Sequence, residues 1–289
     1  MEETLLTRRR FCWLAGGLAA TAGLPASGQS PKNQLRVIAY NVYECTGWPH
    51  QRPLAQQAVK LGQMPKRLAD ELALYEPDII NFSESPEEAV VQEVAQRLGM
   101  KYVYFPSGQN WPGALLTRFE ILGSKNCPVV GGERPKDLFT RHWGMAEVRL
   151  RDGQTLVVHS AHLRPGAEPE IRQREISQML RSMKPDLEAE RPMLLIGDLN
   201  HSPEQPEYQM WKKGGWTDTF AQVGKGDGFT IKADLPKWRI DYVWAVGPIA
   251  KQVVESRPLY QGAFRLNIAD EQSFALSDHL PQLAVLKIH

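Results

Sequence analysis

Short apolar runs recur along the sequence, and several of them end at a polar or ionisable residue. Residues 35–40 alternate and are rich in β-branched and aromatic side chains, so they predict a first strand that ends at Asn41. The same pattern predicts a strand before Glu84 and another that ends at His162. Further strands are predicted at 102–105, 114–118, 145–150, 193–196, 238–244 and 282–288.

The apolar positions of three other segments repeat with helical spacing. Helices are predicted over 55–75, over 87–98, where Gly99 ends the helix, and over 170–183. Residues 211–220 have no clear period and predict a mixed loop. Because strands, hairpins and helices alternate without a strict strand–helix–strand repeat, the sequence predicts an α+β domain built on mixed sheets.

The stretch Arg191–Pro203 contains the most informative of these strands. The apolar run 193–196 is followed by Asp198 and Asn200, so in extended backbone the two side chains would point the same way. A carboxylate beside a carboxamide suits a hard cation, a phosphate oxygen or a water to be activated. Asp, Asn, Ser and Pro are also ordinary turn residues, so this stretch taken alone favours a turn.

The first 28 residues have the composition of an export signal. Arg8–Arg10 precede Phe11, an apolar Ala/Gly-rich run extends to Leu24, and small residues follow. The apolar run is too short for a stable membrane anchor, and the adjacent arginines resemble a twin-arginine export signal. A general secretory signal or an uncleaved interfacial segment is the alternative. We predict a signal peptide at 1–28, one domain at 29–289, and a periplasmic or secreted protein.

Removal of that segment changes the charge and the cysteine content. The chain carries 34 basic and 33 acidic side chains, and the segment holds three Arg and two Glu, which leaves 31 of each and no net charge. A neutral chain has no overall attraction to nucleic acid or to an anionic membrane. Cys45 and Cys127 remain; they could pair in an oxidising compartment, but two cysteines make no disulfide framework.

Eight polar residues lie in or at the edge of apolar β segments. They are Asn41, Glu84, His162, Asp198, Asn200, Asp241, Asp278 and His279. Burial of an ionisable group is unfavourable unless a metal or a partner compensates for the lost hydration. Its repetition at many strand ends therefore predicts a single polar site at the rim of a sheet.

The order of these eight residues resembles the endonuclease/exonuclease/phosphatase superfamily, which includes pancreatic-type deoxyribonucleases, abasic-site endonucleases, sphingomyelinases and inositol-polyphosphate phosphatases. Gly-Asp-Leu-Asn at 197–200 and Ser-Asp-His at 277–279 are the most specific parts, followed by Arg-Ile-Asp-Tyr at 239–242. The resemblance extends over essentially the whole chain after the signal. It implies a four-layer αββα sandwich with two mixed β-sheets, and cleavage of a P–O bond that depends on Mg²⁺ or Mn²⁺.

The resemblance also implies a metal site. Glu84 and Asp278 would bind the cation through carboxylate oxygens, with Asn41 beside them. Acids are also favourable at the start of a helix, so Glu84 has a structural alternative. Members of the superfamily usually carry Gln before the metal-binding Glu, whereas this chain has Ser83, whose shorter hydroxyl could support the site through water. Whether a second metal binds stays open.

The remaining residues would perform the chemistry in the same resemblance. Asp198 would orient or deprotonate the attacking water, and Asn200 would hold that water or a phosphate oxygen. His279, steered by Asp241, would direct a ring nitrogen at the phosphate. His162 would donate a hydrogen bond to the charge that develops on the phosphoryl oxygens. The sequence leaves open whether Asp198 or His279 is the base.

Several nearby residues also have structural explanations. His159 is three positions before His162, which puts it on the opposite face of a strand, so we predict a packed or hydrogen-bonded histidine. Arg141 could bind phosphate, whereas Arg118 is predicted to be structural. Three tryptophans in predicted loops suit either substrate contact or packing: Trp48, Trp111 and Trp143.

These observations together predict an exported, monomeric, Mg²⁺-dependent phosphoesterase with no membrane anchor after signal cleavage. The neutral charge and the lack of a Lys/Arg-rich stripe favour a small or lipid-derived organophosphate over long nucleic acid, although a secreted nuclease is an alternative. A catalytically inactive binding protein on this fold would need a missing ligand or base, and none of the eight is missing. A glycosidase that uses two carboxylates would leave His162, His279 and Asn200 without a role.

Overall fold

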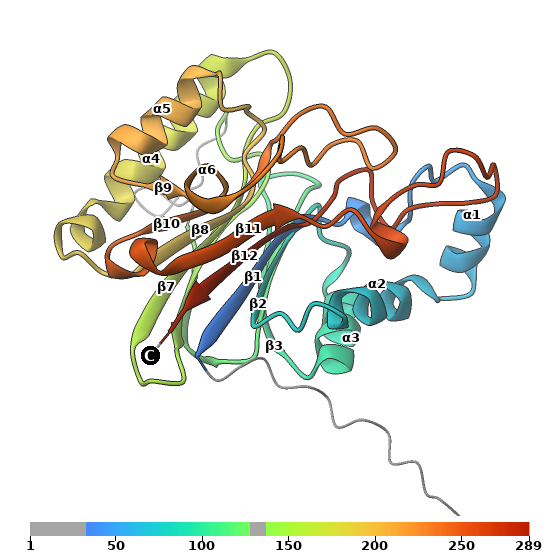
Figure 1. Ribbon diagram of the computed structural model, residues 1–289, viewed down its shortest axis with the longest axis horizontal. Coiled ribbons are helices and arrows are strands. Elements are labelled where there is room, and N and C mark those ends of the chain that lie inside the picture. The colour runs from blue at the N-terminus through green and yellow to red at the C-terminus, as the bar shows by residue number, and fades with distance from the viewer. Residues whose placement is uncertain (1–32, 128–136, 289) are drawn as a thin grey trace, which may run out of the picture.

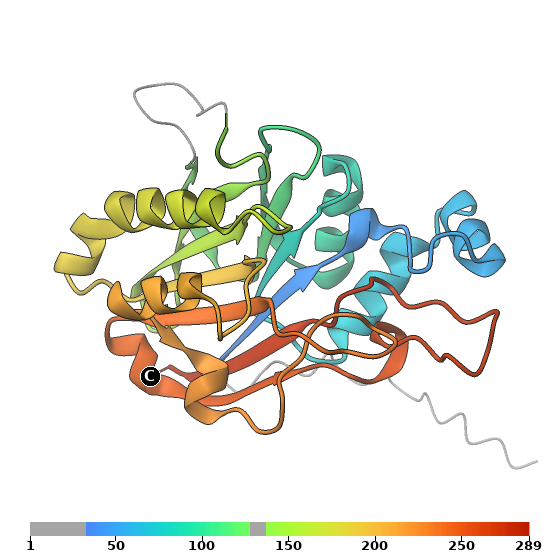
Figure 2. The same cartoon turned by 90° about the horizontal axis from the view of Figure 1, so that it is seen from above.

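The computed structural model describes residues 33–127 and 137–288. In these ranges the chain forms two six-stranded sheets that face each other, with helices on their outer sides (Figures 1 and 2). The predicted signal segment 1–28 lies outside the described residues. Among the described helices, none has the length and apolar character needed to span a bilayer.

Each sheet contains one parallel pair of strands near its centre. In the first sheet β1 runs parallel to β2, and in the second β7 runs parallel to β8; the other pairs are antiparallel. The order of the first sheet is β11 (Val253–Pro258), β12 (Gln282–Lys287), β1 (Gln34–Asn41), β2 (Ile79–Ser83), β4 (Gly113–Thr117) and β3 (Lys101–Phe105). The order of the second is β5 (Glu120–Asn126), β6 (Trp143–Arg149), β7 (Thr155–His162), β8 (Met193–Asp198), β10 (Asp241–Val246) and β9 (Thr217–Asp218).

Three apolar layers hold the sheets and helices together. Alternate residues of the central strands, such as Val37, Val158 and Ile196, meet between the sheets. The other face of the first sheet packs on α2 (Met64–Ala73) and α3 (Glu88–Leu98), and that of the second on α4 (Pro169–Glu188) and α5 (Pro206–Lys213). This arrangement confirms the predicted α+β class and the four-layer αββα sandwich.

Shorter elements complete the chain. α1 (Pro53–Lys60) buries only Ala55 and Ala58 and projects at one end of the molecule (Figure 1). α6 (Thr219–Val223) directly follows β9 in the chain. Three short 3₁₀ segments are η1 (Tyr43–Cys45), η2 (Pro248–Gln252) and η3 (Gly262–Phe264).

Some predicted boundaries are wrong. The helix expected over 55–75 is interrupted at 61–63, because Gly62 adopts a left-handed φ of +63° between α1 and α2. The segment predicted as a mixed loop contains the end of α5, strand β9 and the start of α6. α5 spans only eight residues and buries Tyr208 and Trp211 as its apolar side chains, so it has too few repeats to show a helical period.

The cysteines do not pair. Cys45 and Cys127 are both free and buried, and they lie in different apolar layers on the outer sides of the two sheets. Burial raises the pKa of each thiol to about 12, so both are inert thiols at neutral pH.

Candidate active site

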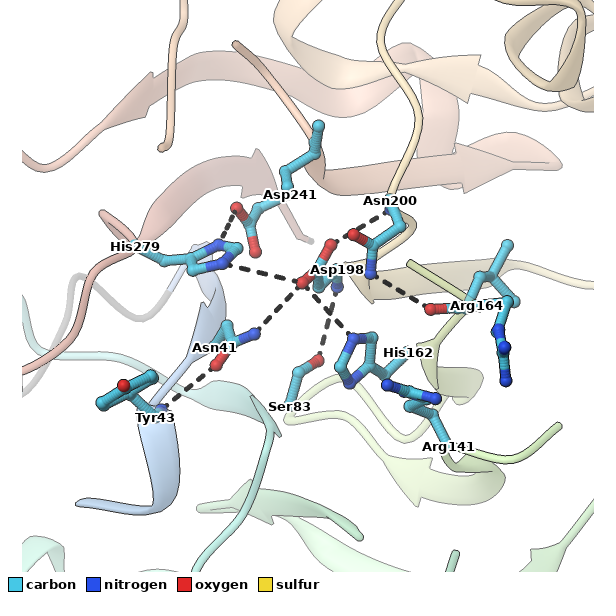
Figure 3. Close-up of polar contacts among 12 residues, drawn as sticks. Asn41, Tyr43, Ser83, Arg141, His162, Arg164, Asp198, Asn200, Asp241 and His279 are labelled. Carbon is cyan, nitrogen blue, oxygen red and sulfur yellow. Dashed lines mark hydrogen bonds and ion pairs between the residues drawn. The ribbon is translucent and has the colours of Figure 1, made fainter. Parts of the chain in front are cut away.

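The parallel strands of both sheets end at the same rim of the sandwich. Asn41 at the end of β1 is paired with Ser83 at the end of β2, and His162 at the end of β7 is paired with Asp198 at the end of β8. Asp241 begins β10 opposite Asp198. Polar side chains from separate parts of the sequence therefore gather at one point, as the strand-end pattern predicts (Figure 3).

Asp198 lies at the centre of this group and is 2% exposed. Its Oδ2 accepts a hydrogen bond from Asn41 Nδ2 at 3.1 Å, which links the two sheets. The same oxygen is 3.5 Å from His162 Nε2 and 3.8 Å from His279 Nε2 (Figure 3). Three nitrogen-bearing side chains thus surround one carboxylate oxygen.

His279 is held by a second carboxylate. Its Nδ1 is 2.8 Å from Asp241 Oδ2, and its backbone N–H donates to Ser277 Oγ at 3.1 Å. Burial lowers the pKa of His279, but the carboxylates of Asp241, Asp198 and Asp278 outweigh it and raise the pKa to about 10. The ring is therefore protonated at neutral pH, and its Nε2–H points toward Asp198.

His162 is in the opposite electrostatic situation. Burial, His142, Arg141 and His279 together lower its pKa well below 6.5, so the ring is neutral. Arg141 is half-buried beside it, and its guanidinium lies 5.8 Å from the centre of the Trp111 ring. The half of the site around His162 and Arg141 is therefore suited to an anion (Figure 3).

The carboxylates of Asp198, Asp241, Glu84 and Asp278 form the other half of the site. Burial and Asp241 raise the pKa of Asp198, although His279 and Asn41 act in the opposite direction. Burial also raises the pKa of Glu84, and Asp278 adds to that rise. Such shifts are expected where acidic groups are buried close together, and a bound cation would act in the opposite direction.

Two donor sets could hold a metal here. Asn41, Glu84 and Asp278 offer oxygen atoms only, which suits Mg²⁺. The ligand atoms of Asp198, Asp241 and His279 lie within 4.8 Å of one another. In that second set, however, His279 and Asp241 already hydrogen-bond to each other.

The backbone around two of these residues is unusual. Glu84 and Asn200 have left-handed φ angles of +46° and +52°. At Asn200 this corrects the expectation of extended backbone after Asp198: the N–H of Asn200 donates to Asp198 Oδ1 at 3.1 Å and forms a turn. Asn200 Nδ2 donates to the Leu163 carbonyl at 3.1 Å, so the turn keeps Asn200 at the site beside β7.

Ser83 contacts the site directly. The backbone N–H of Asp198 lies 3.4 Å from Ser83 Oγ, so this serine contacts the end of β8 directly. Below it, Asn81 Nδ2 donates to Ser160 Oγ at 2.7 Å, and His142 Nε2 is 2.9 Å from the same oxygen. Isolated polar residues within the apolar runs of β2 and β7 were the only sequence signal for this network.

The other candidates divide between structure and site. His159 is buried and accepts a hydrogen bond from the Trp143 indole at 3.3 Å, and Arg118 donates to the backbone carbonyls of Pro77 and Leu98. Trp143 belongs to the core on β6 rather than to a loop. Trp48 and Trp111 are both half-buried, and Trp111 contacts Arg141.

Comparison with known proteins gives a family match over most of the chain. The family model of the endonuclease/exonuclease/phosphatase family matches residues 38–279. No sequence among the curated proteins matches this chain significantly.

Several solved structures have the same fold. A Bacteroides thetaiotaomicron protein of that family superposes with a TM-score of 0.68 at 17% identity, covering 89% of this chain and 98% of the other. A B. thetaiotaomicron mannosyl-6-phosphatase gives 0.68 at 17% identity over 86% and 98%. Truncated Caenorhabditis elegans TDP2 gives 0.64 at 16% identity over 88% and 98%.

Proposed function

The chain belongs to the endonuclease/exonuclease/phosphatase family and is a hydrolase of phosphoric ester bonds; on that premise we propose a Mg²⁺-dependent esterase for small or lipid-derived organophosphates, exported from the cytoplasm. The observation that carries this proposal is the position of Asp198 Oδ2. It lies within 3.8 Å of nitrogens from Asn41, His162 and His279, at the rim where both sheets end.

In the proposed reaction a water oxygen forms a bond to phosphorus while the P–O bond to the alcohol breaks. Asp198 accepts the proton of that water through Oδ2, the oxygen that faces the centre of the site. The alcohol leaves with a proton, which His279 supplies from Nε2 while Asp241 holds its other nitrogen at 2.8 Å. The products are one phosphate ester or free phosphate and one alcohol.

Asn41, Glu84 and Asp278 would hold the cation, which would supply positive charge to the phosphoryl oxygens when bound. His162, neutral because its pKa is lowered by burial and by His142 and Arg141, would donate one N–H to the same oxygens. Asn200 would position the water or a phosphate oxygen from its turn after β8.

Charge supports the choice of a small substrate. After signal removal the chain is neutral, whereas long nucleic acid is bound through many phosphate contacts and large salt effects. One similar structure is a mannosyl-6-phosphatase and another is TDP2, so relatives of this fold do not point to a single substrate. A secreted nuclease is the second candidate.

A substrate panel tests the proposal. Purified protein with Mg²⁺ is assayed side by side on plasmid DNA, sphingomyelin, inositol phosphates, sugar phosphates and small diesters, at low and at high salt. We expect turnover of a small or lipid-derived ester with weak salt dependence. Plasmid cleavage that exceeds all small substrates and falls steeply with salt would replace this proposal with the nuclease.

The export route has its own test. Arg8–Arg10 before Phe11 support transport of the folded protein by the twin-arginine route. Replacement of these arginines by lysine is expected to retain the precursor in the cytoplasm. An unchanged exported yield would indicate another pathway.

A further inference from the structure

A cavity of about 480 Å³ adjoins the proposed metal site. It is lined by Tyr43, Glu44, Thr46, His50, Gln56, Val59, Lys60 and Trp111. Its surface is mainly apolar, and its volume falls in the range of small-molecule sites, about 300–1,000 Å³. None of the residues assigned above to catalysis or metal binding lines it.

Two walls of this cavity are tied to the metal site by hydrogen bonds. The backbone N–H of Tyr43 donates to Asn41 Oδ1 at 3.1 Å, and that of Glu44 donates to the Glu84 carbonyl at 2.8 Å. On the other wall, the N–H of Ser85, which follows Glu84, donates to the Pro112 carbonyl next to Trp111 at 2.9 Å. Residues that line the cavity are therefore hydrogen-bonded to two of the residues proposed to bind the metal, Asn41 and Glu84.

The wall that carries Tyr43 is held in a strained form. Tyr43, Glu44 and Cys45 have consecutive left-handed φ angles of +49°, +51° and +58°. Non-glycine residues rarely adopt this conformation, and several in a row persist only when their surroundings hold them. Tyr43 on this turn lines the cavity, and its hydroxyl lies 3.2 Å from Nδ1 of His50, another lining residue.

Trp111 connects the cavity with the anion-binding half of the site. Its ring lies against Arg141, which is beside His162 (Figure 3). A phosphate held between Arg141, His162 and the cation would thus have an aromatic surface directly next to it. The third wall is formed by α1, where Gln56, Val59 and Lys60 line the cavity and Val59 is 46% exposed.

We infer that this cavity binds the organic group of the substrate, and that this group is apolar: an aryl or alkyl group esterified to the phosphate. Two aromatic side chains and Val59 supply the contact surface, whereas Glu44, Gln56 and Lys60 lie among the polar lining residues. The inference rests on the proposed function, because it takes the phosphate position from it. It makes Tyr43, Trp111 and Val59 determinants of specificity.

Binding of two phosphonates, which have no ester bond to break, tests this inference apart from catalysis. The dissociation constants of phenylphosphonate and methylphosphonate are measured by calorimetry with Mg²⁺ present. We expect wild type to favour phenylphosphonate by at least about tenfold, since removal of a ring from water is worth that much. Val59→Asp is expected to lower this preference about tenfold, because the new carboxylate faces the ring.

Leu54→Asp is the matched control. Leu54 lies on the same helix and is 43% exposed, but it does not line the cavity, so its replacement should leave the preference unchanged. Melting temperatures show whether each variant is folded.

Equal affinity of wild type for both phosphonates would overturn the inference, as would an equal effect of Val59→Asp and Leu54→Asp. Tighter binding of a sugar phosphate or a nucleoside monophosphate, lost in Val59→Asp, would assign the cavity to a polar group instead. Failure of the proposed function appears differently: no phosphate ester is hydrolysed, whatever the phosphonates do.

Discussion

Gly197 lies directly before Asp198 in β8, and its replacement by alanine tests how tightly the two central strands must approach. Its φ is +148°, a conformation that L side chains rarely adopt. A Cβ at this position would lie 1.8 Å from the carbonyl oxygen of Ala161 in β7. Ala161 is the parallel partner of Gly197, so the clash is with backbone rather than with a movable side chain.

The magnitude follows from that distance. Normal contact begins near 3.4 Å, so β7 and β8 must separate by about 1.6 Å, from 1.8 to 3.4 Å, or the backbone must change. A side chain in a disfavoured backbone region costs about 1–3 kcal/mol, and overpacking costs about 1–3 kcal/mol more. We expect a loss of about 4 kcal/mol in the free energy of unfolding, or about 8–16 °C in melting temperature.

Chemical and thermal unfolding measure this change, with Gly123→Ala as the control. Gly123 lies in β5, has no left-handed φ, and a Cβ there would meet no atom within 4 Å. That variant should stay within about 0.5 kcal/mol of wild type. The Gly197 variant should also lose turnover at temperatures where it is folded, because Asp198 is displaced from His162. Equal stability of the two variants would refute the reasoning.

Three further predictions concern a buried ion pair, acid stability and catalysis. Arg172 and Glu207 are 1% and 0% exposed and form a 2.9 Å ion pair between α4 and α5. Arg172→Met should lower the free energy of unfolding by about 3–5 kcal/mol, because it leaves the Glu207 carboxylate buried without its partner, and adding Glu207→Met should recover most of that loss. Denaturant unfolding shows whether the double variant is more stable than Arg172→Met. Burial lowers the pKa of His159 to about 4, so between pH 6.5 and 4 the unfolded chain binds more protons than the folded chain. As the pH falls through this range, this histidine lowers the free energy of unfolding by up to about 3 kcal/mol. His159→Leu should therefore make the free energy of unfolding less dependent on pH. Asp198→Ala and His279→Ala should each reduce kcat/KM by about 100-fold or more with the fold intact, and near-normal turnover would remove that residue from the mechanism.

The sequence predicts the site better than it predicts the connecting segments. Polar residues that end apolar strands, such as Asn41, His162 and Asp198, are visible because burial of polar groups is rare without a partner. Parallel pairing brings the ends of these strands to one rim of the sandwich, so residues that are far apart in the sequence form one cluster in the folded protein.

Features that depend on tertiary contacts were not predictable. The left-handed turn at Tyr43–Cys45 is held by hydrogen bonds to Asn41 and Glu84, and nothing in its composition requires it. The sequence predicts a loop at Trp143, whereas this residue lies on the outer face of β6 and is 1% exposed. Its position depends on the helices that cover that face, which the local pattern does not show.

The most direct test of the account is metal-dependent turnover of bis-(p-nitrophenyl) phosphate by wild type and by Glu84→Gln. Wild type freed of metal by EDTA should release no nitrophenol, and Mg²⁺ should restore release. In Glu84→Gln, which keeps the side-chain shape but loses a charged ligand, restoration should require much more Mg²⁺ or fail. Undiminished hydrolysis by metal-free wild type, or equal Mg²⁺ dependence of the two proteins, would contradict the assignment of this site as a metal-dependent phosphoesterase.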